Sequence, residues 1–201
     1  MKRILNIPSV YNFWVNLVFK NKDPFFQEFL IKHEAGIKML DIGCGPGRLS
    51  HHFWDTIYTG MDLSQKYIDM ARRRYRDFPS LSFYCADVNN FFTGQVEHDF
   101  NHKFDLIFMF GLLHHLNDAE VDKLMSTVST LLRPCGMFRS LDGVFTENQS
   151  RIDRFILKND RGKFVRTEKE YLDLIRPHLP NAQYGIRSDL LIFPYSIIFF
   201  Y

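Results

Sequence analysis

The chain has 201 residues, of which 46% are hydrophobic and 24% charged, and its formal net charge is +2. Such a chain is long enough to bury the core of one domain, and its balanced charge gives no broad attraction to nucleic acid. The widely separated Cys44, Cys85 and Cys135 form no C-x-x-C pair, so they predict free thiols in a reducing cytoplasm and neither a zinc ribbon nor a disulfide framework.

Neither end of the chain has the pattern of a secretion signal or a membrane span. Asn and Pro residues interrupt the apolar N-terminus, and no small-residue cleavage site follows. The apolar stretch 190–201 contains Pro194 and Ser196 and is shorter than the ~20 residues that cross a bilayer. We therefore expect one cytoplasmic domain over residues 1–201, without a transmembrane segment.

Residues 1–36 predict two cap helices. On the first helix, apolar side chains recur on one face, at Tyr11, Trp14, Val15, Val18 and Phe19. The second helix has Asp23 as N-cap, Pro24 at its first position and Gly36 just past its end. We expect both to lie over the carboxyl ends of the strands, where open α/β sheets bind ligands.

The stretch Asp41-Ile42-Gly43-Cys44-Gly45-Pro46-Gly47 predicts a tight turn between a strand over 37–42 and the start of a helix. Glycines there let the backbone approach a ligand and adopt positive φ, and a helix start offers unpaired N–H groups. A dinucleotide-binding turn has its third glycine one residue later, where this chain has Arg48. The turn therefore favours a nucleotide-like cofactor other than NAD.

Acidic residues follow the next two expected strands. Asp62 comes after the strand over 57–61, and Asp87 comes after the strand over 81–85. A carboxylate at the end of the second strand can accept hydrogen bonds from both ribose hydroxyls, and one at the end of the third can accept from an adenine amino group. Together these residues predict a site for adenosine without phosphates.

Later segments continue the alternation of strands and helices. Strands are expected over 104–109, 136–141, 182–186 and 196–201, and helices are expected to be capped at Ser64, to begin at Asp118 and to lie near 168–176. This pattern predicts a mostly parallel sheet with helices on both faces. Two histidines, His114 and His115, follow the fourth strand, and Asp142 ends the fifth.

The chain resembles the class I S-adenosylmethionine-dependent methyltransferases of small-molecule type. The matching blocks are residues 40–47, 60–64, 85–88, 104–107, 112–116 and 131–136, within roughly residues 37–142. The resemblance implies a Rossmann-like, doubly wound sheet of seven strands, mostly parallel, whose last strand inserts antiparallel between its neighbours. The chain departs from the family at Pro134-Cys135-Gly136, where many members have Pro-Gly-Gly.

The resemblance also implies which residues hold the cofactor. Gly43, Gly45 and Gly47 would hold the methionine half of S-adenosylmethionine, Asp62 its ribose, and Asp87 with the Val88 amide its adenine. The expected cofactor site further includes Asp41, Cys44, Leu63 and Phe110.

For catalysis, the resemblance places the family's commoner loop histidine at His115, which is the favoured candidate. His114 and Asp142 are the other candidates. A structural role in the loop for His114, and a helix-cap or turn-cap role for Asp142, remain alternatives.

Residues 143–166 are expected to form an insertion on the substrate side. They contain Arg151, Arg154, Arg161 and Arg166 among Phe145, Phe155 and Phe164. With the first cap helix, they predict an amphiphilic acceptor that has an apolar body and an acid group, the alternative being that the arginines are solvated. No metal is expected, because the polar residues Glu97, His98, Asp99 and His102 have no matched partners elsewhere.

The predicted function is transfer of a methyl group from S-adenosylmethionine to an oxygen or nitrogen of a small molecule. Alignment and exclusion of water contribute most to such a transfer, and proton removal by a histidine adds an acceptor-dependent part.

Two alternatives stay open at this point. One is a methyltransferase acting on RNA or protein, although Phe110-Gly111-Leu112-Leu113 replaces the Asn/Asp-Pro-Pro-aromatic loop of base-methylating members, and the arginines at 72–74 and 76 are typical of a solvated helix end. The other is a non-catalytic partner protein that binds S-adenosylmethionine. The sequence leaves the acceptor and the oligomeric state open.

Overall fold

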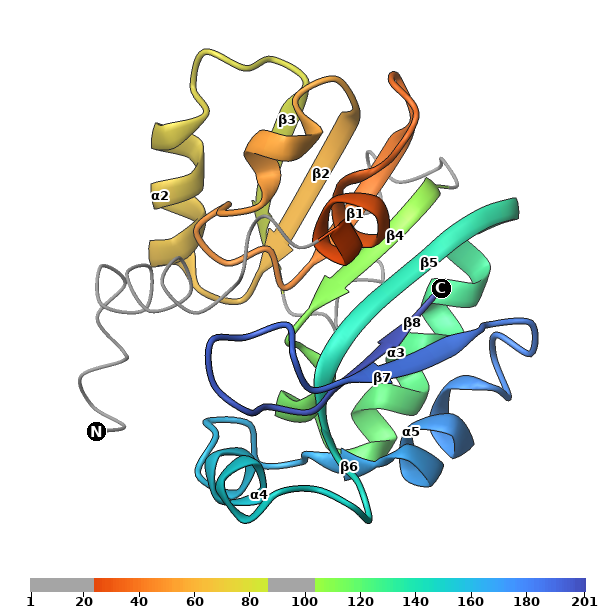
Figure 1. The fold of residues 1–201 in the computed structure, drawn as a ribbon. Coiled ribbons are helices and arrows are strands. Elements are labelled where there is room, and N and C mark those ends of the chain that lie inside the picture. Colours follow the sequence, from red (N-terminus) through yellow and green to blue (C-terminus); the bar gives the residue numbers. More distant parts are fainter. Residues whose placement is uncertain (1–23, 87–103) are drawn as a thin grey trace.

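The computed structural model describes residues 24–86 and 104–201. Its strands form one sheet in the order β3-β2-β1-β4-β5-β8-β7 (Figure 1). The strands are β1 Lys38–Ile42, β2 Ile57–Asp62, β3 Leu81–Cys85, β4 Phe104–Phe110, β5 Leu132–Phe145, β7 Tyr184–Arg187 and β8 Ile197–Phe200. In the described part of the chain an eighth, two-residue strand, β6 Arg166–Thr167, pairs with the end of β5, where seven strands were expected.

The strand pairing confirms the expected fold class. Strands β1 to β5 pair in parallel, and β8 lies antiparallel between β5 and β7. Because β1 pairs with β2 on one side and with β4 on the other, the strand order reverses at β1 and β4. Doubly wound sheets bind their ligands at the carboxyl ends of the strands that flank such a reversal.

Helices α2 Gln65–Arg74, α3 Asp118–Leu131 and α5 Glu168–Ile175 begin where the sequence predicted, whereas α4 Arg151–Lys158 lies in the segment 143–166, for which no helix was predicted. The Ser64 side chain accepts a hydrogen bond from the Tyr67 amide, and Asn117 forms a capping box with Glu120, so that α2 and α3 start directly after these caps.

The sheet is packed on both faces. Leu40, Ile107 and Phe138 belong to the core under α3 and α5, whereas the alternating neighbours Met39 and Leu106 belong to the core under α2. Strands buried on both faces are the rule in parallel sheets covered by helices. The arrangement leaves the ends of the strands as the places where a ligand can enter.

Two helices are shorter than expected. The second cap helix consists of residues 24–31, including the π-helical turn η1 Phe26–Ile31, and does not reach Gly36. Just after the helix, His33 Nδ1 lies 2.5 Å from the Ile31 carbonyl oxygen, and His33 Nε2 lies 2.7 Å from Asp55 Oδ1. The chain is thus held by the His33 side chain where the helix ends. The first cap helix lies outside the described residues.

After the glycine turn there is only the 3₁₀ turn η2 Ser50–Phe53. It ends because the Thr56 amide and hydroxyl both donate to the Phe53 carbonyl, at 3.1 and 2.8 Å. The unpaired backbone N–H groups that were expected at the start of a helix are therefore offered by this single 3₁₀ turn.

Strand β5 begins at Leu132, four residues before its expected start at 136. Its first residues therefore include Pro134-Cys135-Gly136, where many family members have Pro-Gly-Gly. Cys135 has φ +64°, the one positive φ of a non-glycine residue among the described residues. Glycine would adopt this conformation without steric cost. Cysteine at this position therefore adds local backbone strain, and the fold is unchanged.

Candidate cofactor and acceptor site

The glycine turn after β1 has the backbone conformation that the sequence predicted. Gly43, Gly45 and Gly47 have φ values of +80°, +55° and +70°. A Cβ built on Gly43 would lie 3.2 Å from Leu112 Cδ1, and one on Gly47 would lie 2.9 Å from Tyr75 Cε2. A Cβ on Gly45 would meet no atom within 4 Å, so the turn is packed at its two ends and open at its centre.

Asp62, at the end of β2, lies directly against that open centre. One carboxylate oxygen accepts from the Gly45 amide at 2.9 Å, and the other accepts from the Ser64 amide at 2.8 Å. Burial raises the pKa of Asp62, against the lowering effect of these two hydrogen bonds. Each oxygen keeps a further lone pair, so the carboxylate can still accept from a pair of hydroxyls. The next side chain, Leu63, is 63% exposed and offers an apolar surface beside the acid.

Behind the turn, a buried chain of hydroxyl groups ends on Asp41. Ser50 Oγ donates to Tyr58 Oη at 2.8 Å, and Tyr58 Oη donates to Asp41 Oδ2 at 2.6 Å. Burial raises the pKa of Asp41 to about 7, and the nearby charge of Asp62 adds to this effect while the Tyr58 hydrogen bond opposes it. The half-buried Cys44 thiol has a raised pKa, chiefly because of burial, and is therefore poorly reactive.

His114 is the histidine that the structure pairs with Asp142. Its Nδ1 lies 2.6 Å from Asp142 Oδ1, and its backbone amide donates to the same oxygen at 3.1 Å. Burial lowers the pKa of His114, but the hydrogen bond and the charges of Asp142 and Asp160 outweigh it, and the pKa is raised overall. Asp142 thus contacts His114, and by accepting a hydrogen bond from its backbone amide it supports the 3₁₀ turn η3 Leu113–His115, in line with the alternative of a turn cap.

The loop after α4 covers His114. Its Nε2 lies 3.6 Å from Asp160, and Asp160 accepts from the Gly162 amide at 2.9 Å and the Tyr195 hydroxyl at 2.8 Å. A Cβ on Gly162 would overlap the His114 ring, and the Phe164 amide donates to the His114 carbonyl. The imidazole is therefore enclosed between two carboxylates and a glycine backbone.

His115 has a different environment. It is exposed, and its ring centre lies 4.3 Å from that of His114. Partial loss of water around the ring, together with the charge of His114, lowers the pKa of His115 to about 4. At neutral pH this imidazole is uncharged and can accept a hydrogen bond.

Arg166 binds the backbone of residues 113–116, which we call the histidine loop. It does not reach toward an acceptor in the way that the sequence suggested. It is buried and donates to the Leu113 and Leu116 carbonyls at 3.0 and 2.7 Å and to Asp118. These two carbonyls flank His114 and His115. Arg154 lies over the Phe145 ring at 5.5 Å. Arg154 and Arg166 are thus engaged within the chain.

Some expected site residues cannot be placed. Asp87, Val88 and the polar residues at 97–102 lie outside the described residues, whereas Phe110 is half-buried at the end of β4. Over residues 24–86 and 104–201, no three His, Cys, Asp or Glu side chains gather as a metal site, and no helix is long and apolar enough to cross a bilayer.

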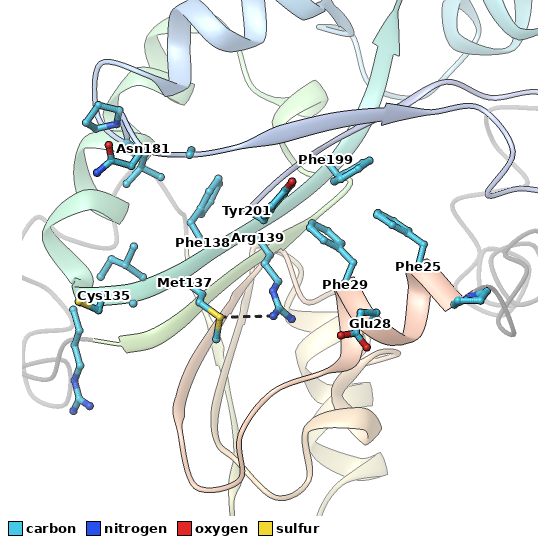
Figure 2. A pocket seen from close by; sticks show the side chains of 17 residues that line it. Phe25, Glu28, Phe29, Cys135, Met137, Phe138, Arg139, Asn181, Phe199 and Tyr201 are labelled. Carbon is cyan, nitrogen blue, oxygen red and sulfur yellow. Dashed lines mark hydrogen bonds between the residues drawn. The ribbon is translucent and has the colours of Figure 1, made fainter.

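A large groove of about 920 Å³ lies elsewhere, between η1, the start of β5 and the end of β8 (Figure 2). Phe25, Phe29 and Phe199 form its aromatic wall, and the Arg139 guanidinium lies over the Phe29 ring, 5.9 Å from its centre. None of the expected cofactor or catalytic residues lines it. The chemistry of the turn and the acids, and not the size of this groove, therefore identifies the candidate site.

Comparison with known proteins agrees with this geometry. The family model described as a methyltransferase domain matches residues 39–136, which contain the glycine turn, Asp62 and the histidine loop. Over these residues the chain has the methyltransferase domain of the class I S-adenosylmethionine-dependent methyltransferases, a family whose cofactor is S-adenosylmethionine.

Individual relatives are similar over part of their length. Cyclopropane-fatty-acyl-phospholipid synthase of Escherichia coli (strain K12) is 29% identical over 52% of this chain and 26% of its own length. Ubiquinone biosynthesis O-methyltransferase of Sinorhizobium fredii is 27% identical over 71% of this chain and 55% of its own length. The methyltransferase chain thus spans between about a quarter and just over half of these curated relatives. The DhpI–SAH complex structure shares the fold, with a TM-score of 0.66 and 16% identity over 99% of this chain and 92% of that one.

Several residues of this methyltransferase site were missed by the sequence reasoning. Tyr58 and Ser50 support Asp41, and Leu112 packs on Gly43. Asp160 and Gly162 enclose His114 from the insertion. One signal in the sequence could have indicated this turn: Gly162 follows Asp160 by two residues. Asp side chains often accept a hydrogen bond from the amide two residues later in a turn, as Asp160 does here from Gly162.

Proposed function

We propose that this methyltransferase transfers the methyl group of S-adenosylmethionine to an oxygen or nitrogen of a small, amphiphilic molecule. The observation that carries the proposal is the open centre of the turn at Gly45 with the Asp62 carboxylate against it, at the reversal of strand order. An adenosine-containing ligand with a backbone-bound tail fits such a site, because hydroxyl acceptors and space for a close approach lie together.

The cofactor-binding residues follow from this fit. Gly43, Gly45 and Gly47 would hold the methionine half, with Asp41 and Cys44 behind them. The ribose and adenine would be held by Asp62, Leu63, Asp87 and Val88, with Phe110 at the side of β4. When bound, S-adenosylmethionine supplies an activated sulfonium methyl group.

The acceptor would be held beside the histidine loop. His115 is exposed and uncharged at neutral pH, so its imidazole can accept a hydrogen bond from an acceptor hydroxyl or amine. A pKa of about 4 makes it a weak base, and its main contribution is therefore alignment. His114, with Asp142 and Asp160, would position the loop and not touch the acceptor.

The residues of the insertion support an acceptor with an apolar body. Phe155 and Phe164 are exposed next to the loop that covers His114. Arg161 lies near enough to His114 for its charge to lower the pKa of that histidine, and it is the arginine of the insertion best placed to meet an acid group. Two relatives are named for fatty-acyl phospholipids and for ubiquinone biosynthesis, and these names agree with an apolar acceptor.

The cofactor is tested by thermal melts with S-adenosylmethionine, its demethylated product and NAD. A ligand at about a hundred times its dissociation constant stabilises a fold by ~2.7 kcal/mol, so the first two should raise the melting temperature and NAD should not. A larger shift with NAD contradicts the cofactor assignment.

The acceptor class is tested with labelled cofactor. The chain is incubated with S-adenosyl-[methyl-³H]methionine and, separately, with small-molecule extract, total RNA and total protein. We expect label in the small-molecule fraction alone. Label in RNA or protein would favour a macromolecular methyltransferase, and tight binding without any transfer would favour a non-catalytic partner.

A further inference from the structure

The surface of α4 and the following loop, part of which lies beside the proposed acceptor site, carries further exposed apolar and cationic side chains. We call it the α4 face: Arg151, Ile152, Arg154, Phe155 and Lys158 of the helix, with Lys163 and Phe164 of the loop. Ile152 and Phe155 are 62% and 66% exposed and lie three residues apart, so they are neighbours on the helix surface. Phe164 is 38% exposed. Large apolar side chains gathered in this way mark an interaction site.

The other side of the same helix is firmly packed. Leu157 is 1% exposed and Asp153 is 2% exposed. Asp153 accepts from the Ser196 amide at 3.0 Å and from the Ser196 hydroxyl, which joins α4 to the chain just before β8. Because these contacts fix the orientation of α4, the exposure of Ile152 and Phe155 is a stable feature of the fold.

The exposed charges of the α4 face are positive. Residues 151–164 contain five cations, Arg151, Arg154, Lys158, Arg161 and Lys163, and two acids, Asp153 and Asp160. Both acids are turned inward, where they bind Ser196, Gly162 and Tyr195. The exposed Glu147 precedes the helix and lines, with Arg154 and Lys169, a separate hollow. In a chain whose net charge is only +2, this surface is strongly basic.

The α4 face also adjoins the acceptor side. The loop that continues from α4 covers His114 through Gly162 and Phe164. Figure 1 shows α4 at the outer edge of the molecule, beyond the carboxyl end of β5. A partner bound to this face would therefore lie next to the place where an acceptor enters.

We propose that the α4 face docks on a bilayer that contains anionic phospholipids. Apolar side chains of an amphipathic helix enter the boundary between headgroups and acyl chains, while nearby cations bind the anionic headgroups. Here Arg151 and Lys158 lie four and three residues from Phe155, on the same side of the helix. Long cationic side chains can reach up to headgroups from beside an inserted ring, so the apolar and the cationic side chains of this face can contact one lipid surface together.

The test is co-sedimentation of the full chain with two kinds of vesicle, one of phosphatidylcholine alone and one of equal parts phosphatidylcholine and phosphatidylglycerol. Binding is expected to the mixed vesicles and to weaken with added salt. The variant Phe155→Trp adds a reporter, whose fluorescence should shift to the blue with the mixed vesicles as the ring leaves water.

Two double variants separate the contributions. Ile152→Ser with Phe155→Ser should abolish the salt-resistant part of binding, and Arg151→Gln with Lys158→Gln should lower the partition coefficient about fivefold per cation removed. These side chains are exposed, so the variants should melt like the wild type. The matched control is Lys66→Gln with Arg73→Gln, two exposed cations of α2, which should bind like the wild type.

The proposal is wrong if the chain ignores the mixed vesicles, binds both kinds equally, or loses binding in the α2 control instead. It is also wrong if light scattering shows a dimer that Ile152→Ser with Phe155→Ser converts to a monomer, since the face would then be a subunit interface. None of these measurements uses methyl transfer, so their failure and that of the proposed function are distinguishable.

Discussion

The cofactor side of the sheet is held together by one strand-turn-strand unit, whereas the acceptor side is assembled from four separate segments. Asp62 binds the Gly45 amide only 17 residues away in sequence. On the acceptor side, His114 meets Asp142, 28 residues on, and Arg166 binds the Leu113 carbonyl across 53 residues. Local hydrogen bonds therefore shape the cofactor turn, and tertiary packing shapes the histidine loop. Substitutions should separate the two sides in matching ways.

The largest effect is expected from Gly162→Ala. The new Cβ would overlap the His114 ring, so the covering loop must move away from the acceptor side. Misplacement of about 1 Å can lower a rate by ~10²-fold, and we expect at least that loss in kcat with unchanged affinity for S-adenosylmethionine. Steady-state kinetics and calorimetry measure the two quantities. Gly36→Ala is the control, because its Cβ would meet no atom within 4 Å; its φ of +77°, which Gly162 does not share, adds backbone strain but no contact with the acceptor side. Equal kcat in both variants contradicts a tightly packed acceptor side.

The two histidines should respond differently to truncation. His115→Ala removes an exposed side chain, so it should lower kcat by about 10²-fold and leave the melting temperature unchanged. His114→Ala leaves Asp142 and Asp160 without their shared cation, so it should also destabilise the fold by about 3 kcal/mol. Kinetics and thermal melts on both variants check this. Full turnover by His115→Ala would mean that His115 contributes neither proton removal nor alignment.

On the cofactor side, Asp62→Ala should weaken binding without disturbing the histidine loop. Loss of the carboxylate leaves ligand hydroxyls and the Gly45 amide unpaired, which costs about 1 to 3 kcal/mol of binding free energy. Calorimetric titration with S-adenosylmethionine gives the value. Asp69→Ala on α2, an exposed acid, is the control, and an equal loss there would remove Asp62 from the site.

The remaining effects concern the pH dependence of stability, and each side of the site has its own pH window. The pKa of Asp41 is raised from 3.8 to about 7, so the fold favours its protonated form, and this contribution to stability is lost as pH rises from 4 to 7. The raised pKa of His114 gives a contribution that is complete below about 6.5 and is lost as pH rises through the higher folded value. In melts across pH, Asp41→Asn should lose the first dependence and His114→Gln the second. If either variant retains the wild-type profile, the group it replaces does not titrate as stated.

The sequence was most informative where function depends on backbone conformation. Positive φ at Gly43, Gly45 and Gly47 and a strand ending at Asp62 are local properties, and both could be predicted. The antiparallel β8 followed from the family resemblance and the Ser64 cap of α2 from a local signal, whereas the full length of β5 was not predicted.

The acceptor side could be predicted only in part, because neighbouring residues look alike in sequence. His114 and His115 are adjacent, and which of them turns inward depends on Asp142, Asp160 and Gly162. Arg166 was grouped with the other arginines of the insertion, although β6 places it under the histidine loop. Contacts of this kind depend on how distant segments pack, and no spacing rule reveals them.

Strand β5 limits how the acceptor side can change its length. Hydrogen bonds to β4, β8 and β6 hold its register, and its side chains alternate, with Phe138 and Val144 in the core under α3 and Leu141 in the opposite core. One residue inserted between Met137 and Leu141 would turn Asp142 to the other face and leave His114 without its carboxylate. The same insertion in the loop 146–150 would alter neither contact. An insertion on the acceptor side is therefore compatible with the contact between His114 and Asp142 only when it falls outside β5, in the loops that surround this strand.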